Sequence, residues 1–252
     1  MTSVLPVRVG KAVAAFGLND LRGAYRDPLL VMLVVAPVIW TTGVAVLTPR
    51  VTDLLSRRYD FDLVPYYPLV LTAFLLLTSI IIAGALAAFL VLDEVDAGTL
   101  SALRVTPVPL SVFFGYRAGT VMLVTTAYVV ATMSLSGILE PGLIPALLPI
   151  GLVAGLSAVV TLLAIVAVAG NKIQGIAMVR ALGMLIAGLP CLPWFIDSAW
   201  NLAFGVLPPY WAAKAFWVAS DHGVWWPYLL GGLIYNLVIA WPLFRRFIAK
   251  NT

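Results

Sequence analysis

The sequence predicts an all-α membrane protein with six transmembrane helices, and its composition is the first reason. Hydrophobic residues make up 62% of the 252 residues and charged residues only 10%, a balance far outside the range of soluble domains. Helices are expected because lipid cannot satisfy free backbone groups, and no stretch alternates in the manner of a membrane β-strand. We expect residues 1–252 to form one transmembrane domain.

The division of the chain into charge-free stretches is the second reason. Most of them reach the roughly 20 residues that a helix needs to cross the hydrocarbon core. The fifth reaches that length only if it begins before Arg180, near Ile173. Six spans is therefore the best count. The stretches cover residues 28–49, 63–92, 118–139, 141–171, 181–196 and 223–244.

The segment before the first span, residues 7–27, is predicted to be an interfacial helix. At 100° per residue its four basic residues gather on one side, while Val9, Val13 and Phe16 lie opposite. One face would meet lipid headgroups and the other the acyl chains. An ordinary positive tail without membrane contact remains an alternative, because Asp20 projects from the apolar side.

The distribution of lysine and arginine predicts that both termini are cytoplasmic. With the N-terminus inside, eleven of the 15 basic residues fall on the cytoplasmic side, as the positive-inside rule requires. The formal charge of +4 therefore reflects topology. Scattered basic residues do not form a nucleic-acid-binding patch. The four that would lie outside are Arg50, Arg57, Arg58 and Lys214.

Two glycine pairs predict close helix packing, because small residues four positions apart let two backbones approach. Gly151 and Gly155 lie in the fourth span. Gly115 and Gly119 repeat the spacing at the start of the third. We expect both pairs to lie in helix contacts.

Residues 197–220 are predicted to form a re-entrant outer hairpin between spans 5 and 6. No charge occurs from Ser198 to Ala213, yet Pro208 and Pro209 interrupt the run and tryptophans surround it. Aromatic residues of this kind favour the membrane interface. We therefore expect the segment to dip into the outer leaflet, and a plain extracellular loop remains the alternative.

Residues 93–107, with the sequence DEVDAGTLSALRVTP, form a polar island between spans 2 and 3. Three acids precede Gly98, and Leu100 and Leu103 then supply an apolar face. Acids at the start of a short helix complement its dipole, and Pro107 marks its end. The pattern predicts a short amphipathic helix on the cytoplasmic side, with an inert loop as the alternative.

This island resembles the cytoplasmic signature of the ABC-2-type transporter permeases, which is a pair of acids, Gly-Thr-Leu, a further leucine and Thr-Pro. The resemblance extends along the chain, since Arg26-Asp27-Pro28 is similar to the start of the family's first span and Leu207-Pro208-Pro209-Tyr210 to its outer hairpin. Asp96 departs from the usual glutamate but keeps the charge. The resemblance implies a coupling helix that docks into an ATPase subunit, through Asp93, Glu94, Asp96, Gly98, Thr99, Leu100, Leu103 and Arg104.

The absence of a phosphate-binding loop of the form G-x-x-x-x-G-K-[ST] indicates that this chain does not hydrolyse ATP by itself. We therefore do not expect an enzyme, a metal or a cofactor on this chain. The resemblance implies two copies of a separate ABC ATPase subunit, which would bind ATP and Mg, and a second permease subunit, identical or paralogous. It also implies a bacterial plasma-membrane location among membrane lipids.

The resemblance further implies that spans 2 and 5 line the transport route. A charge-poor wall suits an amphipathic or lipophilic cargo better than a bare ion. We therefore expect export of a drug or of a lipid from the cytoplasm or inner leaflet. The resemblance implies a drug such as a fluoroquinolone or an anthracycline. Ordinary helix packing remains the alternative for each wall residue. The candidates are Thr72, Phe74, Thr78, Ser79, Met184 and Trp194.

Three other functions are weighed against this one. Exporters of polysaccharide or teichoic acid use the same fold. An ATP-independent secondary transporter is disfavoured because no paired ionisable residues lie at mid-span. An intramembrane serine protease would have to use Ser157 and His222, and His222 is expected at the outer surface.

Overall fold

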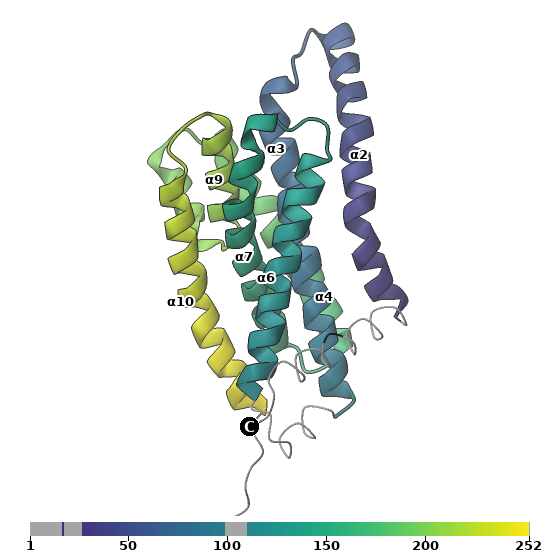
Figure 1. Ribbon diagram of the computed structural model, residues 1–252, viewed down its shortest axis with the longest axis vertical. Helices are drawn as coiled ribbons and strands as arrows, with labels where there is room; N and C mark the ends of the chain where they lie inside the picture. The colour runs from purple at the N-terminus through teal and green to yellow at the C-terminus, as the bar shows by residue number, and fades with distance from the viewer. Residues whose placement is uncertain (1–16, 18–26, 99–109, 252) are drawn as a thin grey trace, which may run out of the picture.

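A computed structural model describes residues 17, 27–98 and 110–251, and these residues fold into long helices without a β-strand (Figure 1). Six helical segments are long and apolar enough to cross a membrane. They coincide with the six stretches predicted from the sequence, so the all-α, six-span fold class is confirmed. The segments are Pro28–Tyr59, Val64–Asp96, Phe113–Ser134, Pro141–Val168, Lys172–Phe195 and Trp226–Ala249.

The first span, α2 (Pro28–Tyr59), begins where Asp27 caps it. The Asp27 carboxylate accepts a hydrogen bond from the backbone N of Leu29 at 2.9 Å, and Pro28 occupies the first helical position, as expected at a helix start. In Figure 1 α2 stands at one edge of the bundle, where it contacts spans 2 and 3. Residues 7–27, the predicted interfacial helix, lie outside the described residues except for Gly17 and Asp27.

The second and fourth spans form the core of the bundle. Span 2 is built from η1 (Val64–Tyr66), α3 (Tyr67–Leu71), the π-helical turn η2 (Thr72–Leu76) and α4 (Leu77–Asp96). Span 4 follows η3 (Pro141–Leu143) as α7 (Ile144–Val168). In the most apolar stretch of each span, 78% of the residues of span 2 and 83% of those of span 4 are buried, against 17% of those of α2. A helix that is apolar on all sides packs on all sides, and α7 contacts α4, α6 (Leu110–Ser134) and α10 (Trp226–Asn251).

The two glycine pairs behave differently. A Cβ at Gly155 would lie 2.7 Å from the carbonyl oxygen of Met122, and one at Gly151 would lie 3.1 Å from Thr126. This pair therefore sets the close contact of α6 with α7, as predicted. The prediction for Gly115 and Gly119 is wrong within the described part of the chain, because no described atom lies within 4 Å of a Cβ at either position.

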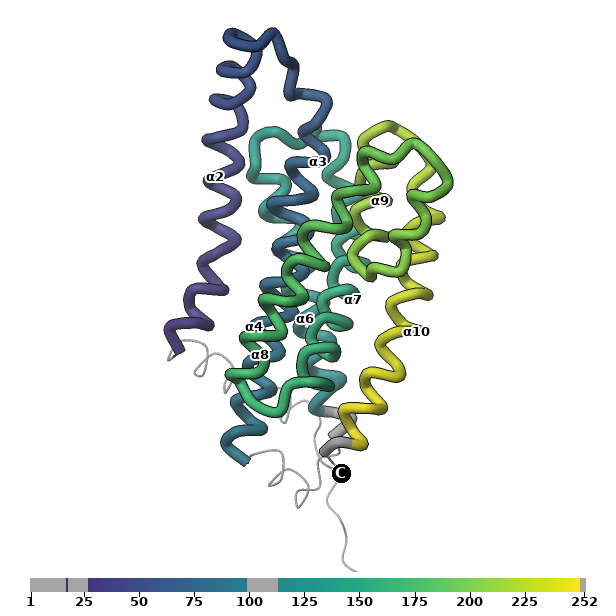
Figure 2. Tube along the Cα trace, turned by 180° about the vertical axis from the view of Figure 1, so that it is seen from behind, coloured from purple at the N-terminus to yellow at the C-terminus, as the bar shows by residue number. Residues whose placement is uncertain are grey.

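The fifth span changes helix type along its length. It begins as α8 (Lys172–Gly183), becomes the π-helical turn η4 (Met184–Gly188) and ends as the 3-10 helix η5 (Leu189–Phe195). Prolines at 190 and 193 cannot continue an α-helix, because each lacks the N–H that the ladder needs. In Figure 2 α8 crosses over α4, which it contacts.

The segment after span 5 folds as a hairpin. Its arms are the 3-10 helix η6 (Ala199–Val206) and α9 (Tyr210–Ser220), which turn at Pro208 and Pro209 before the chain enters α10 (Figure 2). Ser157 of α7 donates a hydrogen bond to the Pro208 carbonyl at 3.0 Å, so the turn is fixed to the core. These two short helices lie within residues 197–220, and the prediction that this segment is a re-entrant outer hairpin remains a prediction.

Candidate functional site

The acidic residues of the polar island lie in the last turn of α4. The prediction that Asp93 begins a separate coupling helix is therefore corrected, since α4 continues through Asp96 and the chain turns at Gly98, which has φ +69°. Carboxylates at a helix C-terminus oppose the helix dipole. The helix can continue because basic residues of other helices offset these charges, as described next.

Lys172, the first residue of α8, is the centre of a charged cluster. Its Nζ donates to the carboxylate of Asp27, which caps α2, and to the carboxylate of Asp93 at 2.9 Å. Its backbone N donates to Asp96 at 3.2 Å. One lysine therefore joins the start of span 1, the end of span 2 and the start of span 5. We call Lys172, Asp27, Asp93 and Asp96 the Lys172 cluster.

The electrostatics of this cluster favour the ionised state of Asp27. The hydrogen bond from Lys172, supported by that from Leu29, lowers the pKa of the Asp27 carboxyl below its ordinary value. Asp27 is therefore ionised at neutral pH. The Lys172 side chain is 23% exposed, so water screens its attraction for the acids only in part.

A second ion pair holds the same turn of α4 to span 3. Arg117 of α6 is 2% exposed, and its guanidinium lies 3.4 Å from the carboxylate of Glu94. The guanidinium also lies 5.3 Å from the ring centre of Phe113 and 5.9 Å from that of Tyr116. A buried arginine is stable only when it is paired and packed in this manner.

The acids in the described part of the predicted coupling segment interact with other helices of this chain, although Asp96, Ala97 and Gly98 are exposed. Asp93 and Glu94 pair with basic side chains of this chain, and Asp96 accepts from the backbone N of Lys172. The sequence had instead predicted that these acids contact a partner subunit. Thr99, Leu100, Leu103 and Arg104 lie outside the described residues.

Two of the candidate pathway residues are buried within the bundle. Trp217 of α9 donates from Nε1 to Thr72 Oγ1 at 2.7 Å, and Thr72 in turn donates to the carbonyl of Pro68. Ser79 donates to the carbonyl of Leu75 at 2.6 Å. These two side chains complete internal hydrogen bonds and do not line a surface of this chain.

The other four candidates are at least partly accessible. Phe74 and Met184 are exposed. Thr78 is half-buried and donates to the Phe74 carbonyl. Trp194 packs edge-on against Trp217, with ring centres 5.3 Å apart. The structure does not bring the six candidates onto one wall.

Two features of this region were not predicted from the sequence. Lys172 and Arg117 were used only to predict which side of the membrane each loop faces, although each stands beside an apolar span and so needs a nearby acid. The π-helical turns η2 and η4, which contain Thr72, Phe74 and Met184, have no sequence signature. Such turns are rare and are frequent at functional sites.

Six membrane-length helices with a charged cluster at one end define a multi-pass membrane protein. Residues 20–244 match the model of a family described as fluoroquinolones export permease protein Rv2686c-like, and the chain belongs to this family. It is 83% identical over 241 residues to the fluoroquinolones export permease proteins Rv2686c and MT2760 of Mycobacterium tuberculosis strains H37Rv and CDC 1551. The match covers 96% of each chain. No solved structure matches this chain.

Membership of this family makes the chain an export permease, the functional class that the sequence predicted. The serine-protease alternative also loses its nucleophile, because Ser157 is buried and donates to the carbonyls of Val153 and Pro208.

Proposed function

We propose that this protein is the ABC-2-type permease subunit of an ATP-driven exporter that moves fluoroquinolones, or drugs of similar amphipathic character, out of the cytoplasm or inner leaflet. The observation that carries the proposal is the 83% identity, over nearly the full length, to fluoroquinolones export permeases. At that identity the two chains share their spans and nearly all their side chains. The ABC-2 assignment rests on the resemblance of residues 93–107 to the coupling signature.

The energy source is assigned to a partner. Two copies of an ABC ATPase bind ATP and Mg, and a second permease subunit completes the transport route. Binding of ATP draws the ATPase subunits together, and the difference in ATP affinity between two arrangements drives the permease between them. Both termini and the Lys172 cluster lie on the cytoplasmic side in this assignment.

The Lys172 cluster supports a role for residues 93–107 in transmitting that movement. Leu100, Leu103 and Arg104 are the residues that dock into the ATPase, with Gly98 and Thr99 leading into them. The acids hold the N-terminal part of the segment to spans 1, 3 and 5 through Lys172 and Arg117. A displacement of the segment is therefore transmitted to α8 and to the π-helical turn η4 that follows it.

The transport route is assigned to the exposed side of spans 2 and 5. Phe74 and Met184 belong to η2 and η4 and are exposed in the single chain, so a drug can contact them between two permease subunits. Thr78 lies beside Phe74, to whose carbonyl it donates, and Trp194 packs against Trp217. Thr72 joins span 2 to α9 through Trp217, and Ser79 donates within span 2.

The proposal is tested by drug accumulation in bacterial cells that express this permease with its ATPase partner. Wild-type cells should accumulate less fluoroquinolone than cells that carry an ATPase in which the phosphate-loop lysine is replaced. Equal accumulation in the two strains, with both proteins present in the membrane, would rule out ATP-driven export. Reduced accumulation that persists without the ATPase would instead identify an ATP-independent transporter.

A further inference from the structure

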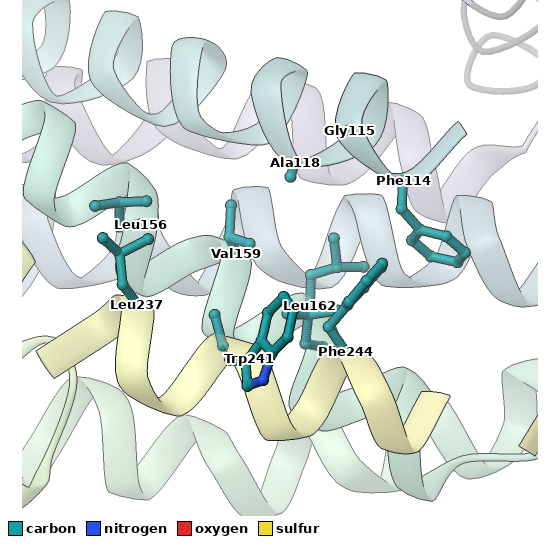
Figure 3. A pocket seen from close by; sticks show the side chains of 11 residues that line it. Phe114, Gly115, Ala118, Leu156, Val159, Leu162, Leu237, Trp241 and Phe244 are labelled. Atoms are coloured by element: carbon teal, nitrogen blue, oxygen red, sulfur yellow. The ribbon is translucent and has the colours of Figure 1, made fainter. Parts of the chain in front are cut away.

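A groove of about 330 Å³ runs along the outside of the bundle between α6, α7 and α10. Figure 3 shows Leu156 and Leu237 toward one end and Phe114 and Phe244 toward the other. Leu237 and Phe244 are seven positions apart, which corresponds to roughly 10 Å along the helix. The groove therefore follows the direction in which the helices would cross a membrane.

The lining of this groove is apolar throughout. Small residues of α6, Gly115 and Ala118, form one wall, and no described atom lies within 4 Å of a Cβ at Gly115. Leucine and valine side chains of α7 form the floor, and Trp241 and Phe244 of α10 form the other wall (Figure 3). No titratable side chain lines it, so its occupant needs no polar partner there.

Positive charge lies at one end of the groove. The guanidinium of Arg245 lies 5.5 Å from the ring centre of Trp241, a lining residue, and so is held beside the groove. Arg246 follows it, and both side chains are exposed. This end of α10 lies at the same end of the bundle as the Lys172 cluster (Figure 1). Exposed arginines at the end of a membrane helix reach the headgroup region.

We propose that this groove binds an anionic phospholipid, with one acyl chain between α6 and α10 and the headgroup phosphate on Arg245 and Arg246. An acyl chain matches the apolar lining, and an anionic headgroup matches the adjacent charge. A fluoroquinolone fits less well, because a drug site normally supplies a few polar groups from its lining. The lipid comes from the leaflet at the Lys172 end.

The acyl-chain contact is tested by filling the groove. Ala118→Leu adds bulk inside it, and Ala127→Leu adds the same bulk at an exposed position of α6 that does not line it. Native mass spectrometry of protein exchanged into dioleoyl phosphatidylglycerol should show a retained lipid on wild type and Ala127→Leu, and loss of that lipid on Ala118→Leu. Gly115→Leu is a second filling variant, with open space for its Cβ. Retention of the lipid by both filling variants would overturn the proposal.

The headgroup contact is tested with dioleoyl phosphatidylcholine, which has the same acyl chains and no net charge. Wild type should retain phosphatidylglycerol in preference to phosphatidylcholine. In the double variant Arg245→Gln/Arg246→Gln this preference should fall roughly 30-fold, because each surface arginine contributes about 1 kcal/mol to the binding of an anionic lipid. Equal retention of the two lipids by wild type would overturn the headgroup assignment. Displacement of the lipid by a fluoroquinolone at one-to-one stoichiometry would show that the groove is a drug site instead.

Discussion

At the scale of single residues, Lys172 links helices that are far apart in the sequence. It joins three spans through Asp27, Asp93 and Asp96. The sequence predicted that the acids of the island matter, but it placed their partners on another subunit. Lys172 and Asp27 are separated by 145 positions. Such a pair cannot be predicted from the periodicity of the sequence, because it depends on how distant helices pack.

Replacement of Lys172 by glutamine should destabilise the bundle. The variant leaves Asp27 and Asp93 close together without their shared cation, and hydrogen bonds to charged groups contribute about 1–2 kcal/mol when partly screened. Unfolding in detergent, followed by tryptophan fluorescence, should show a loss of that size. Arg180→Gln is the matched control, because Arg180 is exposed on the same helix and makes no ion pair with a described residue. Equal stability of Lys172→Gln and wild type would show that the cluster contributes nothing.

At the scale of helices, the positions of the spans were predictable because each is a long run without charge. A turn between η6 and α9 was also predictable, since Pro208 and Pro209 interrupt such a run. The type of helix within a span could not be predicted. The π-helical turns at Thr72–Leu76 and Met184–Gly188 occur in segments whose composition suits an ordinary α-helix, so tertiary packing determines the helix type there.

Glycine spacing predicted one helix contact correctly and one wrongly. The spacing at Gly151 and Gly155 is the same as at Gly115 and Gly119, but only the first pair faces another described backbone. Spacing shows that two helices can approach closely. It does not show which face of the helix they share, and Gly115 instead lines the groove beside α10.

Substitution of Gly155 by alanine should loosen the contact between α6 and α7. The added Cβ would lie 2.7 Å from the Met122 carbonyl oxygen, so the backbones must separate, and overpacking of this kind costs about 1–3 kcal/mol. A lower thermal unfolding midpoint in detergent is the expected result. Gly43→Ala is the control, because no described atom lies within 4 Å of a Cβ at Gly43. Identical midpoints for both variants would mean that this contact is not close.

At the scale of the whole molecule, the bundle separates two sets of loops. The connections from α2 to α3, from α6 to α7 and from α9 to α10 lie at one end (Figure 1), and they contain the exposed Asp60, Glu140 and Asp221. The start of α2 and the end of α4, which contribute acids to the Lys172 cluster, lie at the other end. Fold class and span number could be predicted because the membrane permits few arrangements. The packing order of the spans was not predicted, because it depends on contacts between distant helices. Spans 2 and 4, which form the core, are nevertheless the two most apolar of the six.

The predicted orientation places the Lys172 end in the cytoplasm. Single cysteines at positions 60, 140 and 221, in a Cys191→Ala background, should react with an impermeant maleimide added to intact cells. A cysteine at position 98, in the turn after α4, should react only after the cells are opened. Labelling of position 98 in intact cells would reverse the orientation that the lysine and arginine distribution predicts.

We propose that residues 93–107 couple ATP hydrolysis on a partner to drug export by this permease. The most direct test is fluoroquinolone transport in proteoliposomes that contain the permease and its ATPase, comparing wild type with Leu103→Asp and with the conservative Leu103→Met. Loss of an apolar interface anchor costs about 2 kcal/mol or more, or roughly 30-fold in association. Leu103→Asp should therefore abolish ATP-dependent transport and co-purification of the ATPase, while Leu103→Met retains both. Wild-type transport and co-purification by Leu103→Asp would contradict the account.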